Sequence, residues 1–293
     1  MTLTAHGIVD CTGFEVVKCL PWDLPGGETD DRTDRCQASK RSNWGISICR
    51  PPESMTSGDE SDVNRLHGVV GQLQTDHVQE TCLGVLLNGE LDPLSALSHF
   101  ALACGLSIID RAKLELGDTI VVAGANLLAL SVLVAADGQG ARTACLVPDS
   151  ETATVYRRAI ERLASEVIEF KDISSFDARL DVWVASSIGN TVYVDAIGQP
   201  SSVYAMATRL ARFGKLVFGR QEVTASVELN IADVHHRRSA QFIYWARPEN
   251  LEEALTLAEC YRRAVNLFRW RRISTLLEVA SARPDASSAR ERE

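Results

Sequence analysis

The chain lacks the patterns that identify several large classes of protein. Its eight cysteines are scattered singly, without a CxxC pair or a close repeated spacing, which fits a reducing compartment better than a disulfide framework. No apolar run reaches the roughly 18 residues that a membrane span needs, so we expect no transmembrane helix. The G-x-S-x-G elbow, the Walker loop and the HExxH motif are absent as well.

The chain also has fewer basic than acidic residues. The 293 residues include 30 Lys and Arg against 39 Asp and Glu, a formal net charge of -9, whereas phosphate binding relies on clustered cations. This balance excludes a protein whose whole surface binds nucleic acid, although local basic patches remain. The first fourteen residues contain no Arg or Lys, so no targeting peptide is visible and a cytoplasmic location stays open.

The chain divides by composition into three parts. Residues 1–91 read as a loop-rich N-terminal lobe, because two polar stretches between 24 and 62 flank one apolar segment, Trp44 to Cys49, which predicts a strand. Residues 92–278 hold the periodic apolar segments. Residues 279–293 have almost no large apolar side chains and predict a disordered tail.

The middle of the chain alternates between helical and strand-like patterns. The predicted helices are Pro93 to Ala112, Leu127 to Asp137, Glu151 to Ser165 and Val203 to Arg212. The predicted strands are Thr119 to Ala123, Thr143 to Val147, Val167 to Phe170, Asp181 to Ala185, Val192 to Ala196 and Lys215 to Phe218. Strands separated by helices form parallel βαβ crossovers, so we expect an α/β domain with a Rossmann-like, doubly wound parallel sheet.

These segments resemble a known family. The nucleotide-binding half of the medium-chain dehydrogenase/reductase superfamily is similar to Gly117 to Asp149, Ala164 to Phe170, Val194 to Pro200 and Arg209 to Gly219. A closer resemblance, to the mitochondrial trans-2-enoyl-CoA (enoyl-thioester) reductases, is carried by Ser61 to Gly71, Arg142 to Ile168 and Val223 to Trp245. The resemblance implies a GroES-like, β-rich N-terminal lobe, NADPH as the cofactor of an active enzyme, and a mitochondrial location.

The cofactor turn departs from that family. There, a glycine-rich turn lets the backbone approach the cofactor pyrophosphate at a helix N-terminus. Here Gly124 is retained and Ala129 is an acceptable third member, but Asn126 stands at the second glycine and Leu127 and Leu128 add bulk. Because Asn tolerates a positive φ, we expect the turn to survive while the pocket closes. Gly124, Asn126 and Ala129 are then vestigial cofactor positions.

Two further cofactor positions are implied by the resemblance. With a shift of two residues, Asp149 would hold a ribose hydroxyl; alternatively, Asp149 and Ser150 simply begin a helix as N-cap residues. Arg157 and Arg158 could serve a 2′-phosphate only from an unusual position. Gly198 would border the nicotinamide, or it would be a breaker in a tight strand-to-helix turn.

The proton donor and the cleft are also altered. The family's Tyr would fall near Val70, and Val cannot act as a general acid. Only Gln72 to Leu91 connects this region to the Rossmann part. We therefore expect the N-terminal lobe to be a severely reduced remnant.

A catalytic zinc site is the main alternative to a nucleotide cofactor. Against the motif of zinc alcohol dehydrogenases, His67 and His99 take ligand positions and Cys49 would be the third ligand, which would make an open catalytic site. However, Gly68 replaces the expected Glu and the four-Cys lobe is absent. Ordinary surface or core roles for both histidines are the competing interpretation.

Basic residues gather near the C-terminus with aromatic side chains between them. The cations are Arg262, Arg263, Arg269, Arg271 and Arg272, and such interleaving occurs at RNA and protein contacts. The alternative is the solvated face and last turn of a helix, where the helix dipole favours Arg.

Two functions follow. In the first, the chain is a catalytically degenerate reductase without a cofactor, serving as a structural or interaction subunit of a large mitochondrial assembly such as a divergent ribosome or respiratory complex, or as a homodimer built through a strand near Val223 to Leu229. In the second, it is an NADPH-dependent reductase of an enoyl thioester or quinone with a rearranged site. A fold alone does not decide between them.

Overall fold

A computed structural model describes residues 8–10, 14–21, 44–50, 67–74, 77–78, 83–86, 92–148, 156–170, 178–198, 200–210, 214–219, 241–244, 251–267 and 273–281. The chain forms two compact units, one of Met1–Ala103 with Arg247–Glu293 and one of Cys104–Ala246. Their division falls inside helix α3 (Pro93–Ala112), whereas the boundary predicted from the sequence, between residues 91 and 92, lies just before this helix.

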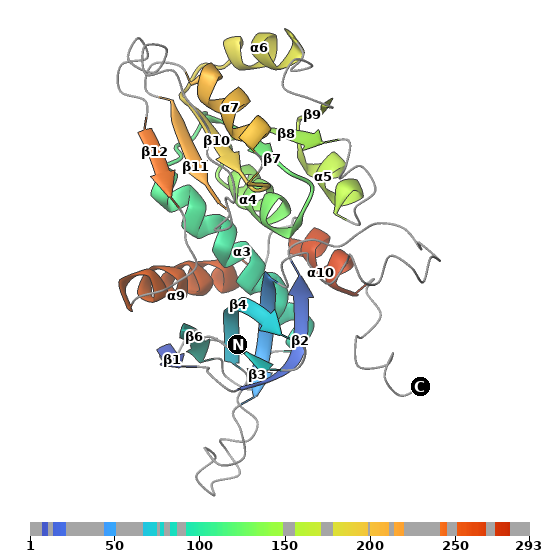
Figure 1. Ribbon diagram of the computed structural model, residues 1–293, viewed down its shortest axis with the longest axis vertical. Helices are drawn as coiled ribbons and strands as arrows, with labels where there is room; N and C mark the ends of the chain where they lie inside the picture. Colours follow the sequence, from blue (N-terminus) through green and yellow to red (C-terminus); the bar gives the residue numbers. More distant parts are fainter. Residues whose placement is uncertain are drawn as a thin grey trace, which may run out of the picture. The chain divides into compact units, whose positions relative to one another are not determined.

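The second unit is built on a six-stranded sheet with the order β12-β11-β10-β7-β8-β9 (Figure 1). All five neighbouring pairs are parallel. The strands are β7 (Thr119–Ala123), β8 (Arg142–Pro148), β9 (Glu166–Phe170), β10 (Thr191–Asp195), β11 (Lys215–Phe218) and β12 (Gln241–Tyr244). The order runs outward from β7 in both directions, which confirms the predicted Rossmann-like, doubly wound class.

Helices make the crossovers. They are α4 (Leu127–Gly138), α5 (Arg157–Leu163), α6 (Ala178–Ala185) and α7 (Pro200–Arg209). Helix α4 is buried at every position from Leu127 to Ala136, as expected for a helix that is apolar all round. The predicted helix over residues 127–137 is confirmed, and α7 confirms the helix predicted over 203–212 as far as Arg209. Helix α5 lies within the predicted helix over 151–165.

One predicted strand is wrong. Residues 181–185 belong to helix α6 rather than to a strand. The short apolar run from Val182 to Ala185 suggested a strand, but the burial follows a helix: Leu180 and Trp183 are buried, while Val182 is 70% exposed. Residues three apart share a helix face, so Leu180 and Trp183 turn inward together.

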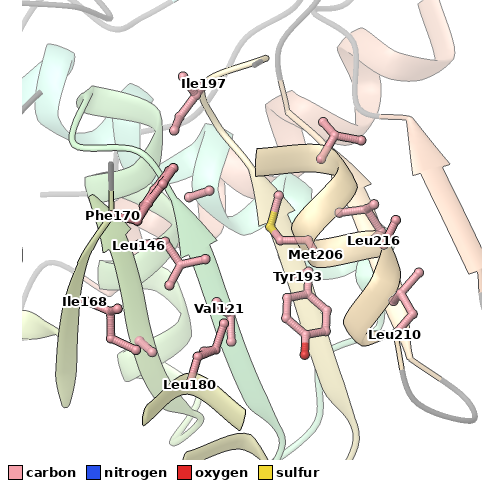
Figure 2. Close-up of a cluster of buried hydrophobic side chains, with 14 of the residues drawn as sticks. Val121, Leu146, Ile168, Phe170, Leu180, Tyr193, Ile197, Met206, Leu210 and Leu216 are labelled. Carbon is pink, nitrogen blue, oxygen red and sulfur yellow. The ribbon is translucent and has the colours of Figure 1, made fainter. Parts of the chain in front are cut away.

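The core of this unit lies between the sheet and helices α6 and α7. Val121, Leu146 and Tyr193 project from adjacent strands toward Leu180 and Met206 of the two helices (Figure 2). Each of these five side chains is fully buried. Burial of a large apolar side chain stabilises a fold by about 1.5–3 kcal/mol, so this layer fixes the strand order and the positions of the strand ends.

Helix α3 meets α4 at a close crossing. A Cβ atom on Gly105 would lie 2.2 Å from the carbonyl oxygen of Ser131, so only glycine fits there. By length and composition, α3 is the one helix in the described part of the chain that could cross a membrane, yet 78% of its apolar window is buried inside the protein. Such burial is the pattern of a core helix.

Polar contacts join the loops at the amino ends of the strands, which we call the amino edge of the sheet. The carboxylate of Asp118 is almost completely buried and accepts hydrogen bonds from the backbone N–H of Glu115 (3.0 Å) and of Asn190 (2.9 Å). Arg142 lies over the ring of Trp183, with its guanidinium carbon 4.2 Å from the ring centroid. These contacts tie the loops before β7 and β10 to each other, and β8 to α6.

The first unit contains an antiparallel sheet with the order β1-β6-β4-β3-β2-β5. Its strands are β1 (Ile8–Asp10), β2 (Glu15–Pro21), β3 (Trp44–Arg50), β4 (His67–Gln74), β5 (His77–Val78) and β6 (Leu83–Leu86). Strand β3 confirms the strand predicted at residues 44–49. Two C-terminal helices, α9 (Leu251–Asn266) and α10 (Ile273–Ser281), belong to the same unit. The predicted tail is therefore helical as far as Ser281.

Candidate functional site

The carboxyl ends of β7 and β10 define the candidate site. Strand β7 pairs with β8 on one side and with β10 on the other, so the chain changes direction across the sheet at this point. Open α/β sheets bind ligands at such a switch point, outside the carboxyl ends of the strands. The turn at residues 124–126 and the loop at residues 196–198 follow these two strands.

Gly124 keeps the conformation that the turn requires. Its φ is +129°, a region that side-chain-bearing residues rarely adopt. A Cβ atom at this position would also lie only 3.1 Å from Cγ1 of Ile197. The backbone N–H of Gly124 donates to the carbonyl oxygen of Leu146 at 2.8 Å. The turn therefore survives, as expected.

Asn126 preserves the turn in a way that the sequence did not suggest. Its backbone is extended, with φ -113° and ψ -178°, so the expected use of a positive φ at Asn126 is wrong. Instead, Asn126 is the N-cap of α4, and its Oδ1 accepts a hydrogen bond from the backbone N–H of Ala129 at 3.0 Å. This contact supplies one of the acceptors that the first turn of a helix lacks.

The same side chain reaches across to the neighbouring strand. Nδ2 of Asn126 donates to the carbonyl oxygen of Ala196 at 2.7 Å, directly after β10. Asn126 is only 3% exposed, so both hydrogen bonds form away from water, where losing either partner is costly. We call this pair of hydrogen bonds the Asn126 bridge.

A second polar residue holds the loop after β10. Asp195 is 1% exposed, and its carboxylate accepts from Ser202 Oγ at 3.1 Å and from the backbone N–H groups of Ile197 and Gly198 at 3.1–3.3 Å. Gly198 has a φ of +74°, which fits its predicted role in a tight turn. Neither Asp195 nor Ser202 was predicted from the sequence. The available signal was a single acidic residue closing an otherwise uncharged strand.

The structure thus brings four of the five predicted cofactor positions to one edge of the sheet: Gly124, Asn126 and Ala129 after β7, and Gly198 after β10. Asp149 lies outside the described residues, so both interpretations of that position stay predictions. The guanidinium of Arg157, the possible 2′-phosphate ligand, is already paired: it forms 2.7 Å ion pairs with Glu161 and Glu169. Burial opposes the charge, but these hydrogen bonds raise the pKa of Arg157 above its ordinary value.

The predicted zinc ligands lie in the first unit. Cys49 of β3 is the cross-strand partner of His67 in β4, while His99 is buried in α3 with its Nδ1 2.5 Å from the carbonyl oxygen of Ser95. Burial lowers the pKa of His99. No group of three metal-ligating side chains occurs among the residues that the structure describes. Val70 also lies in β4.

Only two members of the basic cluster lie in the described part of the chain. Arg262 and Arg263 are in α9, whereas Arg269, Arg271 and Arg272 are outside the described residues. Arg262 makes a bidentate ion pair with Glu259, at 2.7 and 2.9 Å, and this contact lowers the pKa of Glu259. The carboxylate of Glu259 therefore balances the positive charge of Arg262.

Comparisons with known proteins identify the fold. No family model and no curated protein matches the chain. A mycobacterial protein complexed with NADPH superposes with a TM-score of 0.55 at 14% identity, covering 95% of this chain and 88% of that one. S. aureus TarJ in complex with NADPH gives 0.51 at 12% identity, covering 94% and 83%. Benzyl alcohol dehydrogenase from Acinetobacter calcoaceticus gives 0.51 at 14% identity, covering 98% and 91%. These likenesses show that the chain has the fold of medium-chain dehydrogenases and reductases.

Proposed function

We propose that this protein is a catalytically degenerate member of the reductase fold that acts as a structural or interaction subunit. The observation that carries the proposal is the Asn126 bridge. A dinucleotide of the expected kind would present its pyrophosphate to the first turn of α4. Here the Ala129 N–H already donates to an oxygen of the protein itself.

The fit of a dinucleotide to this turn is poor for a steric reason as well. The second glycine of such turns permits close approach of the pyrophosphate to the backbone. Asn126 has a side chain there, fixed at both ends by hydrogen bonds to Ala129 and Ala196. A pyrophosphate would have to displace the amide and leave the buried Ala196 carbonyl without this donor, which costs about 1–3 kcal/mol.

The proposed setting is a large mitochondrial assembly, such as a divergent ribosome or a respiratory complex. The resemblance to mitochondrial enoyl-thioester reductases supports it. We test this setting by sedimenting native mitochondrial extracts in a sucrose gradient. Co-migration with a large particle is the expected result, and migration only as a free small protein contradicts the setting.

Contact with RNA through the arginine cluster belongs to the same proposal. The ion pair between Arg262 and Glu259 leaves little unpaired charge at Arg262, so any such contact rests chiefly on the other arginines. In a filter-binding assay, replacing Arg269, Arg271 and Arg272 together by Gln should abolish RNA retention. The Arg262→Gln variant is the matched control and should retain it.

An NADPH-dependent reductase acting on an enoyl thioester or quinone is the second candidate. One observation favours it: Gly124 keeps a positive φ, as the first glycine of such a tight turn does. Two proteins of the same fold are complexed with NADPH. In this alternative, the Asn126 side chain swings away when NADPH binds.

Calorimetric titration with NADPH and NADH, up to millimolar concentrations, separates the two functions. We expect no saturable binding to the wild-type protein. The Asn126→Gly variant removes the obstruction, and glycine is a tolerated N-cap, so measurable binding to this variant supports the proposal. Asn190→Gly, which changes an exposed asparagine at the amino edge, is the control and should bind neither cofactor. Saturable binding to the wild-type protein overturns the proposal in favour of the reductase.

A further inference from the structure

One peptide unit at the carboxyl ends of the parallel strands, the carboxyl edge of the sheet, is held at both of its ends by buried side chains. It joins Ala196 to Ile197, directly after β10, and we call it the 196–197 peptide. Its C=O group accepts a hydrogen bond from Nδ2 of Asn126 at 2.7 Å. Its N–H group donates to Oδ1 of Asp195 at 3.3 Å. Asn126 and Asp195 therefore hold opposite ends of the same unit.

The peptide unit before it is fixed in a different way, by the neighbouring strands. The carbonyl oxygen of Asp195 accepts from the backbone N–H of Gly219 at 2.8 Å, and the N–H of Ala196 donates to the carbonyl oxygen of Ala123 at 2.9 Å. These contacts continue the pairing of β10 with β11 and with β7. The 196–197 peptide is the next unit along the chain, and there side chains take over from the sheet.

Each of the two side chains also binds a helix. Oδ1 of Asn126 accepts from the backbone N–H of Ala129 in the first turn of α4 at 3.0 Å. Oδ1 of Asp195 accepts from Oγ of Ser202 in the first turn of α7 at 3.1 Å. A continuous series of hydrogen bonds therefore runs from α4, through the 196–197 peptide, to α7.

The members of this series are shielded from water. Asn126, Asp195, Ala196 and Ser202 are all buried. When one buried hydrogen bond breaks, water does not replace it unless the structure opens, so the partner is left unsatisfied at a cost. Hydrogen bonds in a buried chain also polarise and strengthen one another. We therefore expect the bonds of this series to form and break together.

We propose that the 196–197 peptide is a conformational switch that couples the start of α4 to the start of α7. A peptide unit is planar, so its C=O and N–H groups rotate together. When the Asn126 amide leaves the Ala196 carbonyl, rotation of this unit also breaks the contact between the Ile197 N–H and Asp195. Gly198 follows directly with a φ of +74°, and glycine gives the backbone the freedom that such a rotation needs.

The switch makes the two loops of the candidate site open as one unit. A ligand that displaces the Asn126 side chain from the first turn of α4 loosens the loop at Asp195 and the first turn of α7 through this peptide. The inference rests on the Asn126 bridge, as the proposed function does, but it concerns motion rather than cofactor binding. Because its test uses no cofactor, saturable NADPH binding overturns the proposed function and leaves the switch intact.

Amide hydrogen exchange measured by NMR tests the coupling. Replacing Asn126 by Ser retains an oxygen that can cap α4 but removes the amide that reaches Ala196. In this variant we expect the exchange rates of the Ile197 and Gly198 amides to rise at least about tenfold, while the Ala129 amide stays protected.

Ser131→Ala is the matched control. It removes another buried hydrogen bond of α4, in which Ser131 Oγ donates to the carbonyl oxygen of Leu127 at 2.8 Å, but it does not touch the 196–197 peptide. The exchange of Ile197 should then follow that of Val122 in β7, whose amide reports global unfolding.

Coupling between two sites is reciprocal, so the other end of the series gives a second test. Asp195→Asn weakens the acceptor of the Ile197 N–H while keeping the size of the side chain. It should raise the exchange rate of the Ala129 amide at least about threefold. Faster exchange confined to the substituted end in both variants overturns the switch. An equal rise at all amides, including that of Val122, overturns it as well, because a global loss of stability needs no switch.

Discussion

The two ends of the parallel sheet hold their loops in the same way but differ in the side chains that they expose. At each end, a buried aspartate accepts hydrogen bonds from the backbone of the loops: Asp195 at the carboxyl edge and Asp118 at the amino edge. At the carboxyl edge, the Asn126 bridge adds a further buried polar contact. At the amino edge, Leu116 and Ile188 are left exposed.

This difference separates a carboxyl edge completed by hydrogen bonds within the protein from an amino edge that presents apolar side chains. Ligands of doubly wound folds bind at the carboxyl edge because the helix N-termini and their unpaired N–H groups lie there. In this chain, the Asn126 bridge supplies a protein acceptor at that edge. The exposed apolar side chains stand at the other edge, where the fold has no such intrinsic binding feature.

The largest expected effect comes from breaking the carboxyl edge at Asp195. Asp195→Ala leaves Ser202 and two backbone N–H groups without their acceptor, so we expect the free energy of unfolding to fall by about 3 kcal/mol. Urea denaturation monitored by circular dichroism measures the change. Ser202→Ala should cost only about 1 kcal/mol. An equal loss in both variants would contradict a central role for the carboxylate.

At the amino edge, Asp118→Ala should have a smaller effect. Two N–H groups, those of Glu115 and Asn190, lose an acceptor, so we expect a loss of about 2 kcal/mol in the same denaturation experiment. The two aspartates lie at opposite ends of the strands and bind different loops, so their effects should add in the double variant. A strongly non-additive result would show that the two edges are coupled through the sheet.

The Asn126 bridge itself can be divided into its two halves. Asn126→Ala removes both hydrogen bonds and should reduce stability by about 1.5 kcal/mol. Asn126→Ser retains an oxygen that can cap α4 but cannot reach Ala196, so it should recover roughly half of that loss. Thermal unfolding of the three proteins provides the measurement. If Ser and Ala destabilise equally, the cap contributes little.

The smallest effect, and the only stabilising one, is expected outside the sheet, in the first unit. Tyr261 of α9 is 1% exposed and packs against Phe100 with ring centroids 5.0 Å apart, but its hydroxyl has no hydrogen-bond partner among the described residues. Tyr261→Phe removes this polar group and should raise the free energy of unfolding by about 1 kcal/mol. Destabilisation instead would reveal a partner for the hydroxyl.

Much of the fold could be predicted because its signals are local. The strands at Thr119–Ala123 and Thr191–Asp195 are short apolar runs rich in β-branched residues, and breakers bound them. Helix α6 was predicted as a strand because its apolar run of four residues, Val182 to Ala185, fits either period. In the first unit, only the strand near residues 44–49 was predicted, since long polar stretches of sequence interrupt the apolar pattern there.

The candidate site was predicted less completely, for a physical reason. The positions of Gly124 and Asn126 follow from the glycine-rich turn, but the Asn126 bridge depends on the Ala196 carbonyl, seventy residues away in sequence. Local propensity contains no information about that partner. Asp195 was missed for a similar reason, because its partner Ser202 becomes a neighbour only when α7 begins after the tight turn at Gly198.

The Asn126 bridge completes the first turn of α4 without any dissociable ligand. A protein whose helix end is completed by a dissociable ligand gains stability only in proportion to the free ligand, by mass action. A tethered side chain cannot be diluted, consumed or oxidised with the cofactor pool. The contribution of Asn126 to folding is therefore constant, whatever the concentration of free NADPH.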